Sequence, residues 1–264
     1  MTSPAHLRVE RPAEGVVLIT LDNPGRRNAM SDEMTASWVA AIDDLARDPG
    51  LRAVVVTGEG SAFCSGGDTN WIASEPDAQV DYLRTRMVAF YRAWLSVRRL
   101  EVPTIAAVNG PAIGAGLCLA LACDLRYAAG SAKLGAPFVK LGMHPGMAAT
   151  YLLPNVVGEA HARDLLLTGR VVDAEEALRL GLVSRVLPDE SFLDGVLEIA
   201  SGIAASAPIP SRYTTLALRD GGHADFEAAV QWEALAQPIT LATADLQEGI
   251  AAAHAKRMPR FTGR

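Results

Sequence analysis

Residues 102–123 read Val102-Pro-Thr-Ile-Ala-Ala-Val-Asn-Gly-Pro-Ala-Ile-Gly-Ala-Gly-Leu-Cys-Leu-Ala-Leu-Ala-Cys123 and contain no charged side chain. A membrane span needs about 20 apolar residues in one helix, so length alone would allow one here. Prolines and glycines interrupt the stretch, and no single helix fits it. We therefore predict a buried strand over 104–108, a glycine-rich loop over 109–116, and a buried helix that ends near Asp124.

Strands and helices alternate on both sides of this stretch. Residues 15–21, 53–57, 125–129 and 183–186 are typical of strands. One helix is predicted to begin after Ser31, which is an N-cap followed by an apolar face. Two more are predicted over 80–97 and over 174–180, and Asp173 and Glu176 form a capping pattern for the last. Such alternation indicates right-handed crossovers and an α/β fold.

After about residue 201 the strand signals stop. Segments 211–220, 225–237 and 239–257 are predicted to be helices separated by Gly221-Gly222 and by Pro238. We expect a core over residues 1–200 and a helical C-terminal region over 201–264.

The composition excludes several classes of protein. The chain has 264 residues, with 24 Lys and Arg against 30 Asp and Glu, and half of it is hydrophobic. A net charge of −6 argues against binding nucleic acid or an anionic membrane, although a few local arginines could hold an anionic small molecule. Three cysteines (Cys64, Cys118 and Cys123) suit neither a disulfide framework nor a metal site, and residues 1–12 lack the apolar core of a signal peptide. We expect a cytoplasmic protein without a metal.

Two glycine-rich loops, each after a buried strand, are the candidate site. They read Ala62-Phe-Cys-Ser-Gly-Gly-Asp68 and Asn109-Gly-Pro-Ala-Ile-Gly-Ala-Gly116. Missing side chains let a ligand approach the main chain, and the second loop opens a helix whose first N–H groups lack partners. Two such donors aimed at one oxygen would form an oxyanion hole. The alternative for either loop alone is that its glycines only permit a tight turn. The chain has no G-x-S-x-G, P-loop or dinucleotide-binding glycine pattern.

Several motifs occur together in one order: Pro24-Gly-Arg-Arg-Asn-Ala-Met30, the loop 62–68, Pro103-Thr-Ile-Ala-Ala-Val-Asn-Gly110 with Gly114-Ala-Gly116, Cys123-Asp124, and Leu167-Thr-Gly-Arg170. With this order the chain resembles the enoyl-CoA hydratase/isomerase (crotonase) family over roughly residues 7–200. The end of the chain, Lys256-Arg-Met-Pro-Arg-Phe-Thr-Gly263, is similar to the family's C-terminal end.

The resemblance implies a crotonase-like spiral of ββα units with a C-terminal α-helical trimerisation region, and a homotrimer or a dimer of trimers. It implies an acyl-CoA thioester as substrate and no separate cofactor, because coenzyme A is part of the substrate. It places the oxyanion donors at the backbone N–H groups of Cys64 and Ala115. It assigns coenzyme A binding to a larger set: Arg26, Arg27, Ala29, Ser65, Gly66, Gly67, Gly114 and Phe261. For the arginines a solvated loop, and for Phe261 a packing role, are the alternatives.

The chain departs from the family pattern where the chemistry needs side chains. The two glutamates of the family's hydratases match Cys118 and Phe138 here, and an aspartate that some relatives carry matches Gly146. His144, in the loop expected near the acyl group, is the candidate acid or base, and Asp68 is the second candidate. Their alternatives are a histidine bonded to the backbone and a turn-forming carboxylate. Trp71, Tyr82, Met87 and Phe90 could line an acyl pocket or belong to the core.

These observations predict an enzyme that stabilises an enolate-like state of an acyl-CoA thioester, in hydration, isomerisation or another enolate reaction. The alternative is a non-catalytic acyl-CoA-binding or scaffold protein of the same fold.

Overall fold

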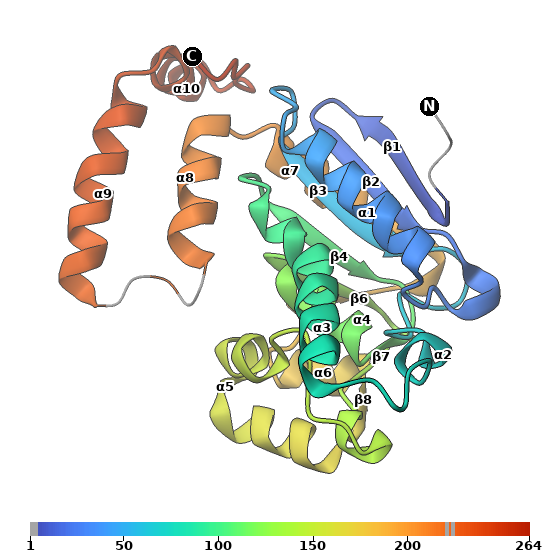
Figure 1. Cartoon of the computed structure of the whole chain (residues 1–264). Helices are drawn as coiled ribbons and strands as arrows, with labels where there is room; N and C mark the ends of the chain where they lie inside the picture. The colour runs from blue at the N-terminus through green and yellow to red at the C-terminus, as the bar shows by residue number, and fades with distance from the viewer. Residues whose placement is uncertain (1–4, 220–221, 223–224) are drawn as a thin grey trace.

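A six-stranded sheet forms the centre of the computed structural model, which describes residues 5–219, residue 222 and residues 225–264. Its strand order is β1-β2-β3-β4-β6-β9, and all neighbours are parallel except the β1–β2 hairpin (Figure 1). The strands are β1 (Leu7–Ala13), β2 (Val16–Leu21), β3 (Ala53–Gly58), β4 (Thr104–Val108), β6 (Leu125–Ala129) and β9 (Arg185–Leu187).

Both faces of this sheet are covered, because alternate residues of each strand point to opposite sides. Val54 and Val56 of β3 belong to the larger apolar core, with α1 (Asp32–Leu45), α3 (Val80–Trp94) and α4 (Ala115–Ala122). Val55 belongs to a second core with α7 (Phe192–Ala204). The alternation explains why β2 and β3 are buried along their whole length.

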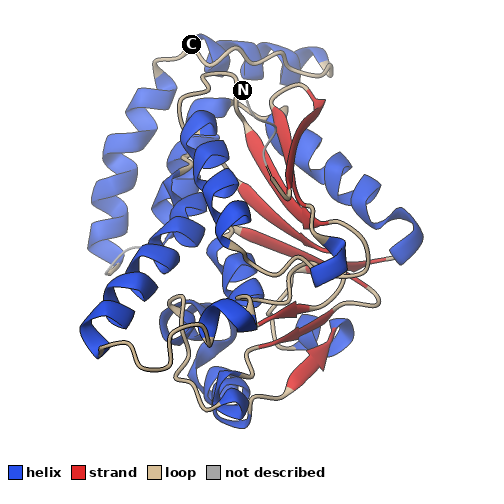
Figure 2. Ribbon diagram, turned by 45° about the vertical axis from the view of Figure 1, so that its right-hand side comes forward, coloured by secondary structure: helices blue, strands red, loops and turns tan. Residues whose placement is uncertain are grey.

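A smaller sheet, β5-β7-β8, lies beside the larger one (Figure 2). Its strands are β5 (Ala112–Ile113), β7 (Lys133–Gly135) and β8 (Val171–Asp173). The remaining elements of the core are α2 (Thr69–Ile72), α5 (Ala149–Thr168), α6 (Ala174–Arg179), and the 3-10 helices η1 (Pro24–Arg26), η2 (Leu95–Arg99), η3 (Phe138–Leu141) and η4 (Asp189–Ser191). Gly158 has non-helical backbone angles and kinks α5.

Three helices after the core form what we call the arm: α8 (Pro208–Leu218), α9 (Phe226–Leu241) and α10 (Ala244–Ala255). In Figure 1, α8 and α9 stand side by side, away from the sheet. Arg219 fastens the end of α8 to the core through Asp124, with Nε–Oδ1 at 2.9 Å and only 9% of the arginine side chain exposed. Several large apolar side chains of the arm are exposed: Leu218, Phe226, Val230, Leu235, Ile239, Leu241 and Ile250.

The structure confirms most of the expected elements. The charge-free stretch is strand β4 followed by helix α4, and Ser31 and Asp173 cap their helices through the N–H groups of Met34 and Glu176. The predicted break at Pro238 is wrong, because this proline lies inside α9 and the chain turns only before α10, which Thr243 caps. Gly221 lies outside the described residues, whereas Gly222 is described and bends the chain between α8 and α9.

In the described part of the chain, no single helix is long and apolar enough to cross a bilayer. One consecutive pair, 189–204 with 208–218, meets the length and composition test only when joined, and it is bent by 110°.

Candidate functional site

A cavity of about 140 Å³ lies where the two glycine-rich loops meet. Its main-chain wall consists of residues 65–67 and 113–115, and its side-chain wall consists of residues 137–147 together with Tyr91 of α3. Trp71, Met87 and Phe90 also line it, which is one of the two alternatives that the sequence left open; Phe90 belongs to the apolar core as well. Tyr82 does not; it is exposed and its hydroxyl donates to Glu75.

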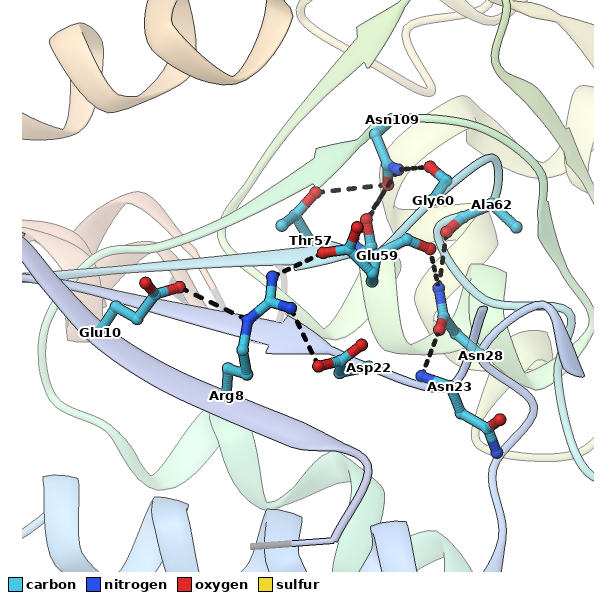
Figure 3. A network of polar contacts seen from close by, with 11 residues as sticks. Arg8, Glu10, Asp22, Asn23, Asn28, Thr57, Glu59, Gly60, Ala62 and Asn109 are labelled. Atoms are coloured by element: carbon cyan, nitrogen blue, oxygen red, sulfur yellow. Dashed lines mark hydrogen bonds and ion pairs between the residues drawn. The ribbon is translucent and has the colours of Figure 1, made fainter. Parts of the chain in front are cut away.

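Two asparagines fix the loop that leads into the main-chain wall (Figure 3). Asn28 is fully buried and donates from Nδ2 to the carbonyl oxygens of Glu59 and Ala62, at 3.0 and 2.8 Å. Asn109 donates to the carbonyl oxygens of Gly58 and Gly60. Since buried carbonyl groups need partners, these amides hold segment 58–62 in one conformation.

Close contact between the loops requires glycine at two positions of the site. A Cβ atom on Gly116 would lie 2.1 Å from the carbonyl oxygen of Cys64. Gly66 has φ +99°, which side chains disfavour, and its Cβ would lie 2.7 Å from the oxygen of Ile113 and 3.3 Å from the nitrogen of Ala115. The glycines therefore bring the two loops into direct backbone contact.

The prediction that Cys64 supplies an oxyanion donor is wrong. Its N–H donates to the Pro111 carbonyl oxygen at 3.1 Å, and Ile113 N–H donates to the Cys64 oxygen, so both main-chain groups of Cys64 are used in a parallel bridge. This N–H therefore serves to join the two loops.

Gly67 offers a free main-chain N–H in the same segment. In the parallel bridge between Met30 and Gly67, Met30 N–H donates to Gly66 O and Asp68 N–H donates to Met30 O. Such a bridge turns the N–H of Gly67 away from Met30. No described residue accepts a hydrogen bond from it, and Gly67 lines the cavity.

Ala115 offers the second donor. It is the first residue of α4, and the first hydrogen bond of that helix runs from Cys118 N–H to Gly114 O at 3.1 Å. The Ala115 N–H therefore has no acceptor within the helix, and the residue lines the cavity next to Gly66. Ala115 is therefore available as a donor, and its role as an oxyanion donor stays a prediction.

The side-chain wall carries no carboxylate among the described residues that line it. Phe138 lies in this wall, and the Cys118 thiol lies behind it, 3.6 Å from the Gly146 carbonyl oxygen. Burial raises the pKa of Cys118 to about 12, so the thiol is protonated at neutral pH. Neither residue can exchange protons as a glutamate would.

His144 lies in the same wall, exposed at the cavity. Its Nδ1 is 2.8 Å from the carbonyl oxygen of Pro145. A proton on Nδ1 shared with this carbonyl leaves Nε2 as the basic nitrogen. The contact with backbone that the alternative interpretation expected is thus present, and it is compatible with a base at Nε2.

Comparison with known proteins gives a consistent result. The family model for enoyl-CoA hydratase/isomerase matches residues 11–264. A probable enoyl-CoA hydratase of Mycobacterium tuberculosis is 44% identical over 215 residues, which cover 80% of this chain and 82% of that protein. Another from Mycobacterium bovis is 40% identical over 261 residues, covering 96% and 92%. The chain belongs to the enoyl-CoA hydratase/isomerase family.

The fold of this family member agrees with solved structures. The crystal structure of an enoyl-CoA hydratase from Bacillus anthracis matches it with a TM-score of 0.92 at 32% identity, covering 98% of this chain and all of that one. The crotonase-like fold predicted from the sequence is confirmed. Its larger sheet differs from a plain repeat in the antiparallel β1, which the sequence analysis did not anticipate.

The positions expected to bind coenzyme A lie together in part. Ser65 N–H donates to the Arg27 carbonyl oxygen at 3.0 Å, and Met30 N–H to that of Gly66, so segments 26–30 and 65–67 run side by side. Arg26 and Arg27 are exposed, Ala29 adjoins them, and Gly114 completes the main-chain wall.

Two other expected site residues lie elsewhere. Asp68 forms an ion pair with Arg26, with Oδ2 2.7 Å from Nη1, and it is not among the cavity-lining residues. A carboxylate that is 12% exposed and held by a guanidinium is suited to bracing segment 26–30 and not to proton transfer in the cavity. Phe261 packs against Gly249 of α10, and its Cε1 would lie 3.5 Å from a Cβ atom placed on that glycine. This contact is the packing role named as its alternative.

Two site residues escaped sequence reasoning. Gly67 was expected only to line the coenzyme A channel. The bridge that leaves its N–H free is formed with Met30, which is 37 positions earlier in the chain. Tyr91 is part of a helical pattern and belongs to no motif, so no signal in the sequence marked it.

Proposed function

We propose that this protein binds an acyl-CoA thioester in the cavity and holds the thioester oxygen between the N–H groups of Gly67 and Ala115. The observation that carries this proposal is that both groups line one cavity and lack a partner among the described residues. Two fixed donors stabilise the negative charge that develops on the oxygen when an enolate forms. Burial in a cavity that is mostly apolar strengthens both hydrogen bonds.

His144 is the proposed base for the proton on the carbon next to the carbonyl. Its Nε2 is the nitrogen left without the Pro145 contact, and histidine is the side chain most often used for general acid and base catalysis. Hydration, isomerisation and other enolate reactions all share this step. The absence of carboxylates at Cys118 and Phe138 favours a reaction other than hydration by paired glutamates, or a protein that binds thioesters without turnover.

The exposed Arg26 and Arg27, with segment 65–67, would hold the nucleotide part of coenzyme A by charge and main-chain contacts. The exposed apolar side chains of the arm support assembly with further copies, as a homotrimer or a dimer of trimers. Phe261 could reach a neighbouring copy's site only through such an assembly.

Ala115→Pro tests the proposal. Proline fits the first position of a helix but has no N–H, so the variant removes one oxyanion donor and leaves α4 in place. We expect exchange of the α-proton of butyryl-CoA in heavy water, followed by NMR, to fall about 100-fold to 1,000-fold. Val80→Pro, at the exposed first position of α3, is the matched control and should exchange at the rate of the unmodified protein.

Three outcomes separate the alternatives. Loss of exchange in Ala115→Pro alone supports the oxyanion hole. Binding of thioesters by the unmodified protein without exchange or turnover would favour the binding protein. Equal exchange in both proline variants would remove Ala115 from the mechanism.

A further inference from the structure

One hydroxyl group in the cavity has no assigned partner. Tyr91 of α3 is partly buried and lines the cavity, and its ring packs edge-on against Phe90 with centroids 6.3 Å apart. None of the described residues forms a hydrogen bond with its hydroxyl, which is not completely shielded from solvent. A tyrosine hydroxyl turned into an apolar cavity normally has a partner, so this one points to a group that a ligand would bring.

The hydroxyl occupies the place that a side chain at position 146 would fill. A Cβ atom on Gly146 would lie 2.5 Å from Tyr91 Oη and 3.0 Å from its Cζ. Because Gly146 has no side chain, the ring reaches the backbone of the 137–147 loop. The tyrosine thus supplies a second polar side chain, besides His144, to a wall that otherwise presents apolar groups such as Phe138 and Met147.

The position of this hydroxyl along α4 can be stated. Cys118 lies three residues after Ala115, a rise of about 4.5 Å along the helix axis. The Cys118 thiol contacts the carbonyl oxygen of Gly146. The Tyr91 hydroxyl lies beside the same glycine. A thioester that is held at Ala115 N–H and whose acyl chain runs along α4 toward Cys118 would bring its second and third acyl carbons toward Tyr91.

We infer that Tyr91 Oη donates a hydrogen bond to an oxygen on acyl carbon 3, so that the cavity selects 3-oxo or 3-hydroxy acyl thioesters over unsubstituted ones. This inference rests on the proposed function, since it uses a thioester seated at Ala115. Burial raises the pKa of Tyr91, and the hydroxyl stays protonated and able to donate at neutral pH. A carbon-3 oxygen without this donor would lose one hydrogen bond inside the cavity.

The test compares two thioesters that differ by one oxygen, 3-oxobutyryl-CoA and butyryl-CoA, in calorimetric titrations of the full chain. The unmodified protein should bind 3-oxobutyryl-CoA about tenfold more tightly. In Tyr91→Phe this preference should vanish or reverse, while the affinity for butyryl-CoA stays within twofold. Tyr82→Phe, on the exposed side of the same helix, is the matched control and should keep the preference.

A second variant displaces the hydroxyl without removing it. Gly146→Ala places a methyl group where Tyr91 Oη lies, so the preference should fall as in Tyr91→Phe. Thermal melting of each variant separates an effect on the site from a loss of folded protein.

The inference is overturned if Tyr91→Phe keeps the preference, if it weakens both ligands equally, or if the unmodified protein binds both ligands alike. In each of these results butyryl-CoA still binds, and the proposed function stands. If neither thioester binds the unmodified protein, the proposed function fails, and the role of Tyr91 fails with it.

Discussion

The two walls of the cavity differ in what they are made of. The main-chain wall, residues 65–67 and 113–115, offers N–H groups on loops that touch backbone to backbone. The side-chain wall, residues 137–147 with Tyr91, offers rings, thioethers and one hydroxyl. The first wall is therefore determined by the fold, and the second by the choice of side chains.

This difference bears on the two parts of the proposed chemistry. Any side chain at Gly116 would enter the backbone of the neighbouring loop, so the fold itself determines the positions of the Gly67 and Ala115 N–H groups. Cys118 and Phe138 stand where glutamates are expected, and the fold accepts them because both pack as apolar groups. In the proposed function, binding of the carbonyl oxygen and transfer of the proton therefore depend on different walls of one cavity.

Gly116→Ala should have the largest effect on stability, because it places a new atom inside the main-chain wall. The new Cβ would lie 2.1 Å from the Cys64 oxygen, and the two loops must separate to admit it. We expect a loss of about 3 kcal/mol or more in the free energy of unfolding, measured with urea. Gly202→Ala in α7, where nothing lies within 4 Å, is the control and should be neutral or stabilising by up to about 1 kcal/mol. Equal stability of the two variants would contradict the rigid main-chain wall.

His144→Ala removes an imidazole from the side-chain wall. It should leave the fold unchanged, because the residue is exposed. Removing a general base typically costs about 100-fold or more in rate. We expect a drop of that size in α-proton exchange with little change in the affinity for butyryl-CoA. His161→Ala, an exposed histidine of α5 outside the cavity, serves as control. An unchanged exchange rate in His144→Ala would remove His144 from the mechanism.

The fold could be predicted further than the site, and particular residues show why. Strand β4 and helix α4 follow from local signals, namely a charge-free run, interrupting glycines and a helix end at Asp124. Local sequence predicts a helix start after the loop 109–116, and the family resemblance singles out Ala115 there. Cys64 and Gly67 are only three positions apart. The bridge of Cys64 with Ala112 uses the Cys64 N–H, whereas the bridge of Gly67 with Met30 leaves the Gly67 N–H free. Such pairing depends on segments far apart in the chain, and no local pattern encodes it. The same holds for Tyr91, which meets Gly146 only through the packing of α3 on the 137–147 loop.

The buried thiols allow a smaller comparison of the two walls. Burial raises the pKa of Cys64 and of Cys118 from 9.0 to about 12. A thiol with a raised pKa in the folded state stabilises the fold fully below pH 9, and this contribution is lost as the pH rises from 9 toward 12, where the unfolded chain ionises first. Each thiol should therefore lower the free energy of unfolding by at most about 1.4 kcal/mol per pH unit in that range.

Cys64→Ala and Cys118→Ala should each make the decline of stability above pH 9 less steep than in the unmodified protein, when urea unfolding is measured at pH 7, 9 and 10. At pH 7 the two variants should differ. The Cys64 thiol donates to the Asn28 oxygen at 3.1 Å and accepts from Gly66 N–H at 3.4 Å, whereas Cys118 makes one contact at 3.6 Å. Cys64→Ala therefore removes two contacts from the main-chain wall and should be less stable by about 1 kcal/mol than Cys118→Ala. Equal stability at pH 7 would mean that the main-chain wall does not depend on the thiol that lies behind it.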